Sequence, residues 1–241
     1  MPIRKVLSAS CGRTVMLSHY AAGEECRAHR HPQAQRSLLL AGSYVEDSEA
    51  GRREVRCRTL SIKPAGFEHE DGFGRAGALI LSVVHEAGDG GASDYHLSAW
   101  PKSVPPLAMT VVEGVGHAST GGPSPDTEGS ARIPSLAQPW LTETRQRLLD
   151  HPQVAVTTLA RTLGKHPVHL ARQFRTTFGE TPSEVRQHAR SARAIDQIVR
   201  SSRTLAHIAF DVGFSDQAHM TRALKAMTGW TPAELRRVLA Y

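Results

Sequence analysis

The C-terminal part of the chain contains an internal repeat with a period of about 50 residues. The two copies are LARTLGKHPVHLARQFRTTFGETPSEVR at 159–186 and IAFDVGFSDQAHMTRALKAMTGWTPAELR at 208–236. Ala160 and Gly164 recur 49 residues later, whereas the positions from His169 onward recur 50 residues later, so the second copy carries one inserted residue. The repeat therefore predicts two copies of one supersecondary unit.

Each copy predicts a helix, a turn that holds one glycine, and a second helix. Gly164 and Gly213 fall just past the first helix, where a residue in the left-handed conformation ends a helix at little cost. His166 in the first copy, and Ser215 or Asp216 in the second, stand where the next helix needs an N-cap. This pattern predicts two helix-turn-helix units, at about 156–177 and 204–227, whose second helices enter the major groove of DNA.

The apolar residues of each second helix lie on one face. Leu170, Phe174 and Phe178 form this face in the first copy, and Met220 and Leu224 form it in the second. The opposite faces carry the candidate DNA-reading residues, which are Val168, Ala171, Arg172, Gln217, Ala218, Thr221 and Arg222.

These outward residue types suit base recognition. Arginine makes bidentate contacts with guanine, glutamine does so with adenine, and valine or alanine contacts the methyl group of thymine. The alternative interpretation is that Arg172 and Arg222 are ordinary solvated side chains. Their equivalent positions in the two copies favour the DNA contact.

A long helix is predicted between the two units, over residues 182–200. Its 19 residues correspond to about 28 Å, whereas one turn of B-DNA spans about 34 Å. Such a helix can hold two reading helices in successive major grooves, so one chain is able to cover two half-sites.

Residues 138–239 resemble the DNA-binding domain of AraC/XylS-type transcriptional regulators. The second copy carries the family's Ile-Ala start, Gly-Phe-Ser turn, Arg-x-x-Lys step and Thr-Pro close. The resemblance implies that both second helices face DNA and that a sensory or dimerisation domain precedes them. Met220 and Leu224 stand where many relatives carry phenylalanine, which affects packing more than DNA reading.

The first hundred residues predict short strands, in runs such as TVMLSHYA, RSLLLAGSY, EVRCRTLSIK and ALILSVVHEA. The predicted fold class is α+β and multidomain, with a small cupin-like β-barrel followed by an all-α domain in which a long helix joins the two units. We place the barrel at 1–100, a short helix (104–116) and a flexible linker within 101–134, and the DNA-binding domain at 135–241.

Two segments resemble the halves of a cupin motif and supply His29, His31, Gln35 and His69 as candidate metal ligands. His29 and His31 share one face of a strand because side chains alternate. Metal-binding cupins carry glutamate where Gln35 stands. Three interpretations remain open: a polar pocket without metal, a sensory site for a divalent metal, and a catalytic metal site.

The basic charge is concentrated at one end of the chain. Residues 135–241 carry 15 Lys and Arg against 8 Asp and Glu, whereas residues 1–100 carry 12 of each. This distribution favours binding of a polyanion by the C-terminal part. Cys11, Cys26 and Cys57 lack a metal-binding spacing and suit a reducing compartment.

We therefore expect a cytoplasmic transcription regulator, more readily an activator than a repressor by resemblance, with no catalytic residues. The expected partners are double-stranded DNA, a small-molecule or metal effector, a second copy of the chain and RNA polymerase, with no membrane contact. A metal-dependent cupin enzyme with a helical accessory domain is the main alternative, and a purely architectural DNA-binding protein is another.

Overall fold

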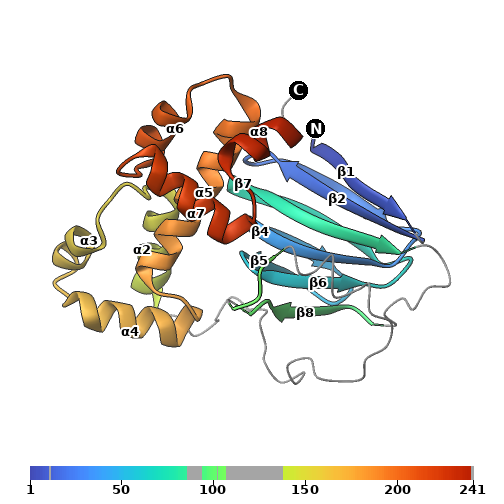
Figure 1. Cartoon of the computed structure of the whole chain (residues 1–241). Coiled ribbons are helices and arrows are strands. Elements are labelled where there is room, and N and C mark those ends of the chain that lie inside the picture. Colours follow the sequence, from blue (N-terminus) through green and yellow to red (C-terminus); the bar gives the residue numbers. More distant parts are fainter. Residues whose placement is uncertain (11, 86–93, 102, 107–137, 240–241) are drawn as a thin grey trace.

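The computed structural model describes residues 1–10, 12–85, 94–101, 103–106 and 138–239. It confirms the predicted α+β class, with a β-rich N-terminal part beside a helical C-terminal part (Figure 1). The strands are β1 (Ile3–Ser10), β2 (Arg13–Tyr20), β3 (Glu25–Arg30), β4 (Gln35–Ser48), β5 (Arg53–Arg56), β6 (Thr59–Lys63), β7 (Glu68–His85) and β8 (His96–Ala99). The helices are α2 (Pro139–Asp150), α3 (Val156–Thr162), α4 (Pro167–Phe178), α5 (Pro182–Arg200), α6 (Leu205–Val212), α7 (Gln217–Thr228) and α8 (Pro232–Leu239).

The strands form one antiparallel sheet in the order β1-β2-β7-β4-β6-β8. The two longest strands, β4 and β7, also pair with β5 and β3, respectively. Side chains from six of the strands line one internal cavity. The sheet therefore curls around this cavity, as the cupin-like prediction requires.

Two glycines allow β4 and β7 to bend where they cross. Gly42 and Gly77 have φ angles of +86° and +68°, in the region that favours glycine. A Cβ atom at Gly42 would collide with the carbonyl oxygen of Gly77, and one at Gly77 would collide with the carbonyl oxygen of Tyr20. The pairing register of β4 shifts next to Gly42. No larger residue fits either position without moving the backbone.

The helices follow the predicted boundaries closely because local signals define their ends. Asp216 caps α7 by accepting a hydrogen bond from the backbone N–H of His219 at 2.7 Å. Thr181 and Glu184 form a reciprocal capping box at the start of α5. Gly213 ends α6 in the left-handed conformation.

The predicted apolar faces of the reading helices are confirmed. Leu170, Phe174 and Phe178 of α4 are buried with residues of α2 and α3 in one core cluster. Met220 and Leu224 of α7 are buried in a second cluster. This second cluster continues through α5 into the sheet, so the N-terminal and C-terminal parts share a core.

The structure corrects several of the strand predictions. It adds β1 and β8, which the sequence patterns did not indicate, and it ends the strand that carries His29 at Arg30, so His31 lies in the loop that follows. The predicted run EVRCRTLSIK is two strands, because the chain turns at Arg58, whose φ is +65°. The predicted helix at 104–116 and the linker lie mostly outside the described residues. No described helix has the length and apolar character needed to cross a bilayer.

Candidate functional site

The first candidate reading surface is the exposed face of α4. Its N-cap is His166, whose ring nitrogen accepts a hydrogen bond from the backbone N–H of Val168. Val168 is 69% exposed although it is apolar. Arg172 is exposed one turn later, and Ala171 beside it is half-buried. The three residues therefore lie together on the face opposite the core.

The second candidate reading surface is the equivalent face of α7. Gln217, Ala218 and Arg222 are exposed, and Thr221 is partly exposed. The hydroxyl group of Thr221 donates to the carbonyl oxygen of Gln217 at 2.9 Å. This backbone contact fixes the threonine side chain on the outer face.

The two arginines differ in their surroundings. A guanidinium nitrogen of Arg172 lies 3.2 Å from Nδ1 of His169, one turn earlier on α4. Arg222 is exposed and makes no comparable hydrogen bond or ion pair among the described residues. Arg222 is thus the less constrained of the pair before DNA binds.

Other arginines of the helical part have a structural role that sequence reasoning missed. Arg186 and Arg190 on α5 both donate to the carbonyl oxygen of Pro152 at 2.8 Å. Arg193 donates to the carbonyl oxygens of Leu149 and Asp150 at the end of α2. Burial, together with the nearby charge of Arg186, lowers the pKa of Arg190 to about 10.

The second part of the candidate site is the cavity inside the curled sheet, with a volume of about 190 Å³. His29 and His31 of β3 and the following loop meet His69 of β7 there. The ring centroids lie 4.8 Å apart for His29 and His31, 4.4 Å for His29 and His69, and 5.3 Å for His31 and His69. One nitrogen of each ring lies within 4.8 Å of the others. The sequence prediction that these three residues come together is therefore matched by the geometry.

Burial favours the neutral form of His31 and His69. It is the largest cause that lowers the pKa of His69 to about 3 and that of His31 to about 4, and the charge of Lys63 adds to both shifts. Nδ1 of His69 is buried and has no hydrogen-bond partner of ordinary geometry among the described residues. Neutral imidazole is the form that binds metal ions.

Gln35 lines the same cavity, but its amide nitrogen is already engaged. It donates to the hydroxyl oxygens of Ser37 and Ser82 at 2.7 and 3.1 Å. Its carbonyl oxygen is therefore the atom that remains for a ligand or a metal.

A carboxylate that the sequence prediction did not assign lies beside the imidazoles. Oδ2 of Asp71 is 3.5 Å from Nε2 of His69, because the two residues share one face of β7. Burial raises the pKa of Asp71 to about 6. The nearby carboxylate of Glu46 is paired with Lys63 and accepts a hydrogen bond from Tyr95.

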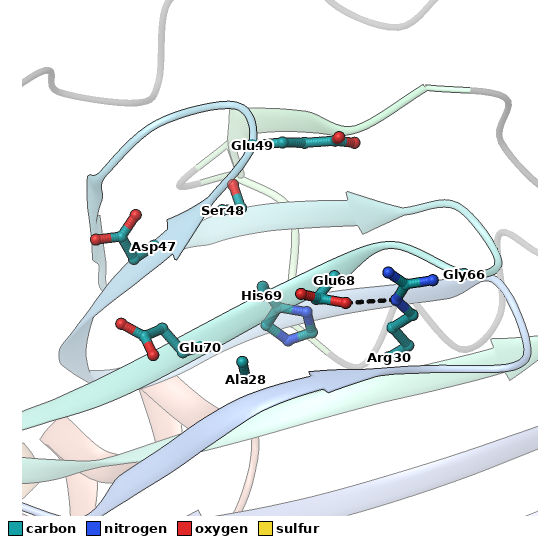
Figure 2. Close-up of a pocket in the computed structure, with 9 residues that line it drawn as sticks. All are labelled: Ala28, Arg30, Asp47, Ser48, Glu49, Gly66, Glu68, His69 and Glu70. Atoms are coloured by element: carbon teal, nitrogen blue, oxygen red, sulfur yellow. Dashed lines mark hydrogen bonds and ion pairs between the residues drawn. The ribbon is translucent and has the colours of Figure 1, made fainter.

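A larger but shallower hollow of about 450 Å³ lies outside this cavity, with His69 in the wall of both. Figure 2 shows acidic side chains around it, and Arg30 paired with Glu68 at its edge. Asp47 and Glu70 are directly opposite each other across β4 and β7. The enclosed cavity is the better ligand site because its polar groups converge.

The comparisons with known proteins concern mainly the helical part. The family model described as "Helix-turn-helix domain" matches residues 159–238. HTH-type transcriptional regulator GlxA of Rhizobium meliloti (strain 1021) is 34% identical over 132 residues, which cover 50% of this chain and 38% of that protein. HTH-type transcriptional activator RhaS of Escherichia fergusonii is 32% identical over 68 residues, which cover 28% of this chain and 24% of that protein. The chain thus spans less than two fifths of these curated relatives.

Two solved structures match the chain with TM-scores below 0.5. ToxT from Vibrio cholerae matches with a TM-score of 0.40 and 10% identity, over 96% of this chain and 100% of that chain. A cupin superfamily protein from Desulfitobacterium hafniense DCB-2 matches with a TM-score of 0.33 and 17% identity, over 36% of this chain and 78% of that chain. Together with the repeat and the capped helices, the family match shows that residues 159–238 are similar to helix-turn-helix domains of transcriptional regulators.

Proposed function

We propose that the chain is a cytoplasmic, sequence-specific DNA-binding regulator of transcription, whose two helix-turn-helix units read adjacent parts of one promoter. The observation that best supports this proposal is that α4 and α7 each bury one face and expose an arginine at the same position of the repeat. The relative RhaS is named an activator, which favours activation through contact with RNA polymerase. We keep residues 1–100 as the sensory and dimerisation part and 135–241 as the DNA-binding part.

In this proposal the exposed residues divide into two kinds of contact. Arg172, Arg222 and Gln217 supply hydrogen bonds to base edges, as bidentate side chains do in the major groove. Val168, Ala171, Ala218 and Thr221 supply apolar contact with thymine methyl groups and close approach of the helix.

The length of α5 supports simultaneous reading of two half-sites. It has 19 residues, or about 28 Å, and belongs to the cores of both units through Val185 at one end and Ile198 at the other. The units are therefore joined by a packed helix. We expect half-sites whose centres lie about 10 base pairs apart.

Selection of bound duplexes from a random pool by the full chain tests the proposal. We expect a bipartite sequence, with one part lost for the Arg172→Ala variant and the other for Arg222→Ala. Enrichment of no sequence at all, with binding that depends only on salt, would reject sequence-specific reading.

For the N-terminal part we propose that the cavity binds an effector and holds a divalent metal of the Zn²⁺ class. His29, His31 and His69 would be three of the metal ligands, and Gln35 would be the fourth. The close approach of the three imidazoles, with one nitrogen of each ring within 4.8 Å of the others, supports the fit. When bound, the metal would give the cavity a cationic centre for an oxygen atom of the effector. The glutamine at position 35, rather than a carboxylate, favours sensing over enzymatic catalysis.

Metal content after equilibration with Zn²⁺ and dialysis tests this second proposal. We expect near-stoichiometric metal in the wild type and loss in His69→Ala, with His96→Ala on β8 as the control for an exposed histidine. If the Gln35→Ala variant retains the metal and the Asp71→Asn variant loses it, Asp71 rather than Gln35 is the fourth metal ligand. Equal metal content in all variants would exclude this site.

A further inference from the structure

One histidine lies at the same position of each helix-turn-helix unit. His169 on α4 and His219 on α7 stand 50 residues apart, three residues before Arg172 and Arg222, respectively. Both histidines are half-buried, whereas both arginines are exposed. The Nδ1 atom of each ring makes a hydrogen bond inside its own unit, but the partners differ. The two units therefore present their arginines in different ways.

In the first unit the histidine accepts a hydrogen bond from the arginine. Nδ1 of His169 lies 3.2 Å from a terminal nitrogen of Arg172. Because a guanidinium group carries only donors, Nδ1 must be the acceptor, and the hydrogen atom of the ring is on Nε2. His169 is therefore neutral in this contact and holds one donor of Arg172 toward the start of α4. The guanidinium keeps its other N–H groups for a base edge.

In the second unit the equivalent histidine pairs with the preceding turn. Hydrogen bonds from the backbone N–H of His219 and from the hydroxyl group of Ser215 lower the pKa of Asp216, so its carboxylate is ionised at neutral pH. A hydroxyl group has one hydrogen atom to donate, so the oxygen of Ser215 accepts from Nδ1 of His219 at 3.0 Å. This nitrogen carries a hydrogen atom and cannot accept from Arg222.

A difference between the two copies accounts for the two arrangements. Lys165 stands 50 residues before Ser215, at the equivalent position of the first copy. Its ammonium group has no acceptor atom, and Nζ lies 5.2 Å from the centre of the Trp140 ring. Lys165 thus offers the imidazole of His169 no acceptor, and the imidazole pairs with Arg172 on its own helix.

We propose that His169 is a positioning residue that fixes the guanidinium of Arg172 for a bidentate contact with guanine, whereas Arg222 is ordered only when the duplex binds. Fixing a flexible side chain before binding removes part of the entropy cost of recognition. The contact also restricts the directions in which Arg172 donates, so it raises the cost of a wrong base pair. This inference rests on the proposed DNA-binding function and adds a residue that determines specificity in the first unit.

Two substitutions at position 169 separate the hydrogen bond from the packing of the ring. Asparagine places an acceptor oxygen as many bonds from the backbone as Nδ1, whereas leucine fills similar space without an acceptor. The measured quantity is discrimination, which is the Kd for a duplex with the base pair of Arg172 substituted, divided by the Kd for the selected duplex. We expect His169→Leu to lower the discrimination of the full chain by about three- to tenfold, as for loss of one hydrogen bond, and His169→Asn to keep it.

The second unit supplies the matched control. His219→Leu should change discrimination at the base pair of Arg222 by less than about twofold, because no hydrogen bond to that arginine is lost. In the Arg172→Ala background, His169→Leu should have no further effect on discrimination, since the interacting pair is already broken. A purely structural role of the ring would not depend on the arginine in this way.

The outcomes separate this inference from the proposed function. Loss of affinity by the same factor for all duplexes after His169→Leu, or equal behaviour of the leucine and asparagine variants, would overturn the inference. So would an effect that persists in the Arg172→Ala background, or a selected duplex whose recognition does not depend on Arg172. If His169→Leu does not fold, His169→Ala removes the same acceptor and decides the question. A wild-type chain that selects no duplex rejects the proposed function itself, whereas discrimination that is independent of His169 rejects only this inference.

Discussion

Replacement of Arg222 by alanine isolates a base contact from the stability of the fold. The side chain is exposed on α7 and holds no hydrogen bond or ion pair in the described part of the chain. Alanine is also the better helix former, so the variant should remain folded. Loss of a bidentate contact with guanine costs about 1–3 kcal/mol, which corresponds to an increase in Kd of about 5- to 150-fold.

The assay is fluorescence anisotropy with the full chain on its selected duplex and on a scrambled duplex, between about 50 and 200 mM salt. We expect Arg222→Ala to weaken the selected duplex much more than the scrambled one. Arg222→Lys should restore the scrambled affinity but not the selected one, because lysine keeps the charge and lacks the planar fork. Arg237→Ala removes the same charge from α8 and serves as the matched control.

One result would refute the assignment of Arg222. If affinities for both duplexes fall by the same factor and the salt dependence decreases by about one counterion, Arg222 contacts phosphate. The exposed position of the side chain is compatible with either contact. The comparison between duplexes distinguishes them.

Three further predictions concern the core, the contact between the parts and acid stability. Phe174→Ala should lower the free energy of unfolding by about 3–5 kcal/mol, measured by urea titration, whereas Phe210→Ala should change it by less than about 0.5 kcal/mol, because Phe174 is fully buried and Phe210 is 81% exposed. Glu54→Gln should lower it by about 1.5–3 kcal/mol by removing the charged partner of Arg145, and equal stability of this variant and the wild type would contradict that role. Although burial alone would raise the pKa of Glu54, Arg145 and Arg56 hold it below its usual 4.5, so its contribution is complete above that pH and is lost as the pH falls through the lowered value. A pH titration of stability should therefore show a smaller acid-induced loss in Glu54→Gln than in the wild type.

The helical part was predictable from the sequence because its signals are local. Gly213 and Asp216 stand three residues apart and by themselves define the end of α6 and the start of α7. The spacing of Leu170 and Phe174 likewise identifies the buried face of α4. Capping and helical periodicity involve neighbours in the chain, so no knowledge of the tertiary structure is needed.

The N-terminal part was predictable only where strands are apolar. β3 has the sequence ECRAHR, whose exposed and cavity-lining residues are mostly polar, so no apolar alternation marks it as a strand. The approach of His29 to His69, 40 positions apart, was expected only from the resemblance to a cupin motif, because it depends on β3 lying beside β7. The contact of His19 with Asp196 depends on packing between the two parts. Such contacts depend on long-range packing, which period and propensity do not encode.

The basic residues of the C-terminal part are not all available on its surface. The 15 Lys and Arg of residues 135–241 suggest a broad basic surface, but Arg186, Arg190 and Arg193 point to carbonyl oxygens at and just beyond the end of α2. These guanidinium groups join α5 to α2 and the loop that follows it, and they are not free to release counterions from DNA. The salt dependence of DNA binding should therefore be weaker than the charge count implies. The same arginines hold α5 in place, so part of the basic composition positions the proposed reading helices and only the remainder is available to contact a duplex.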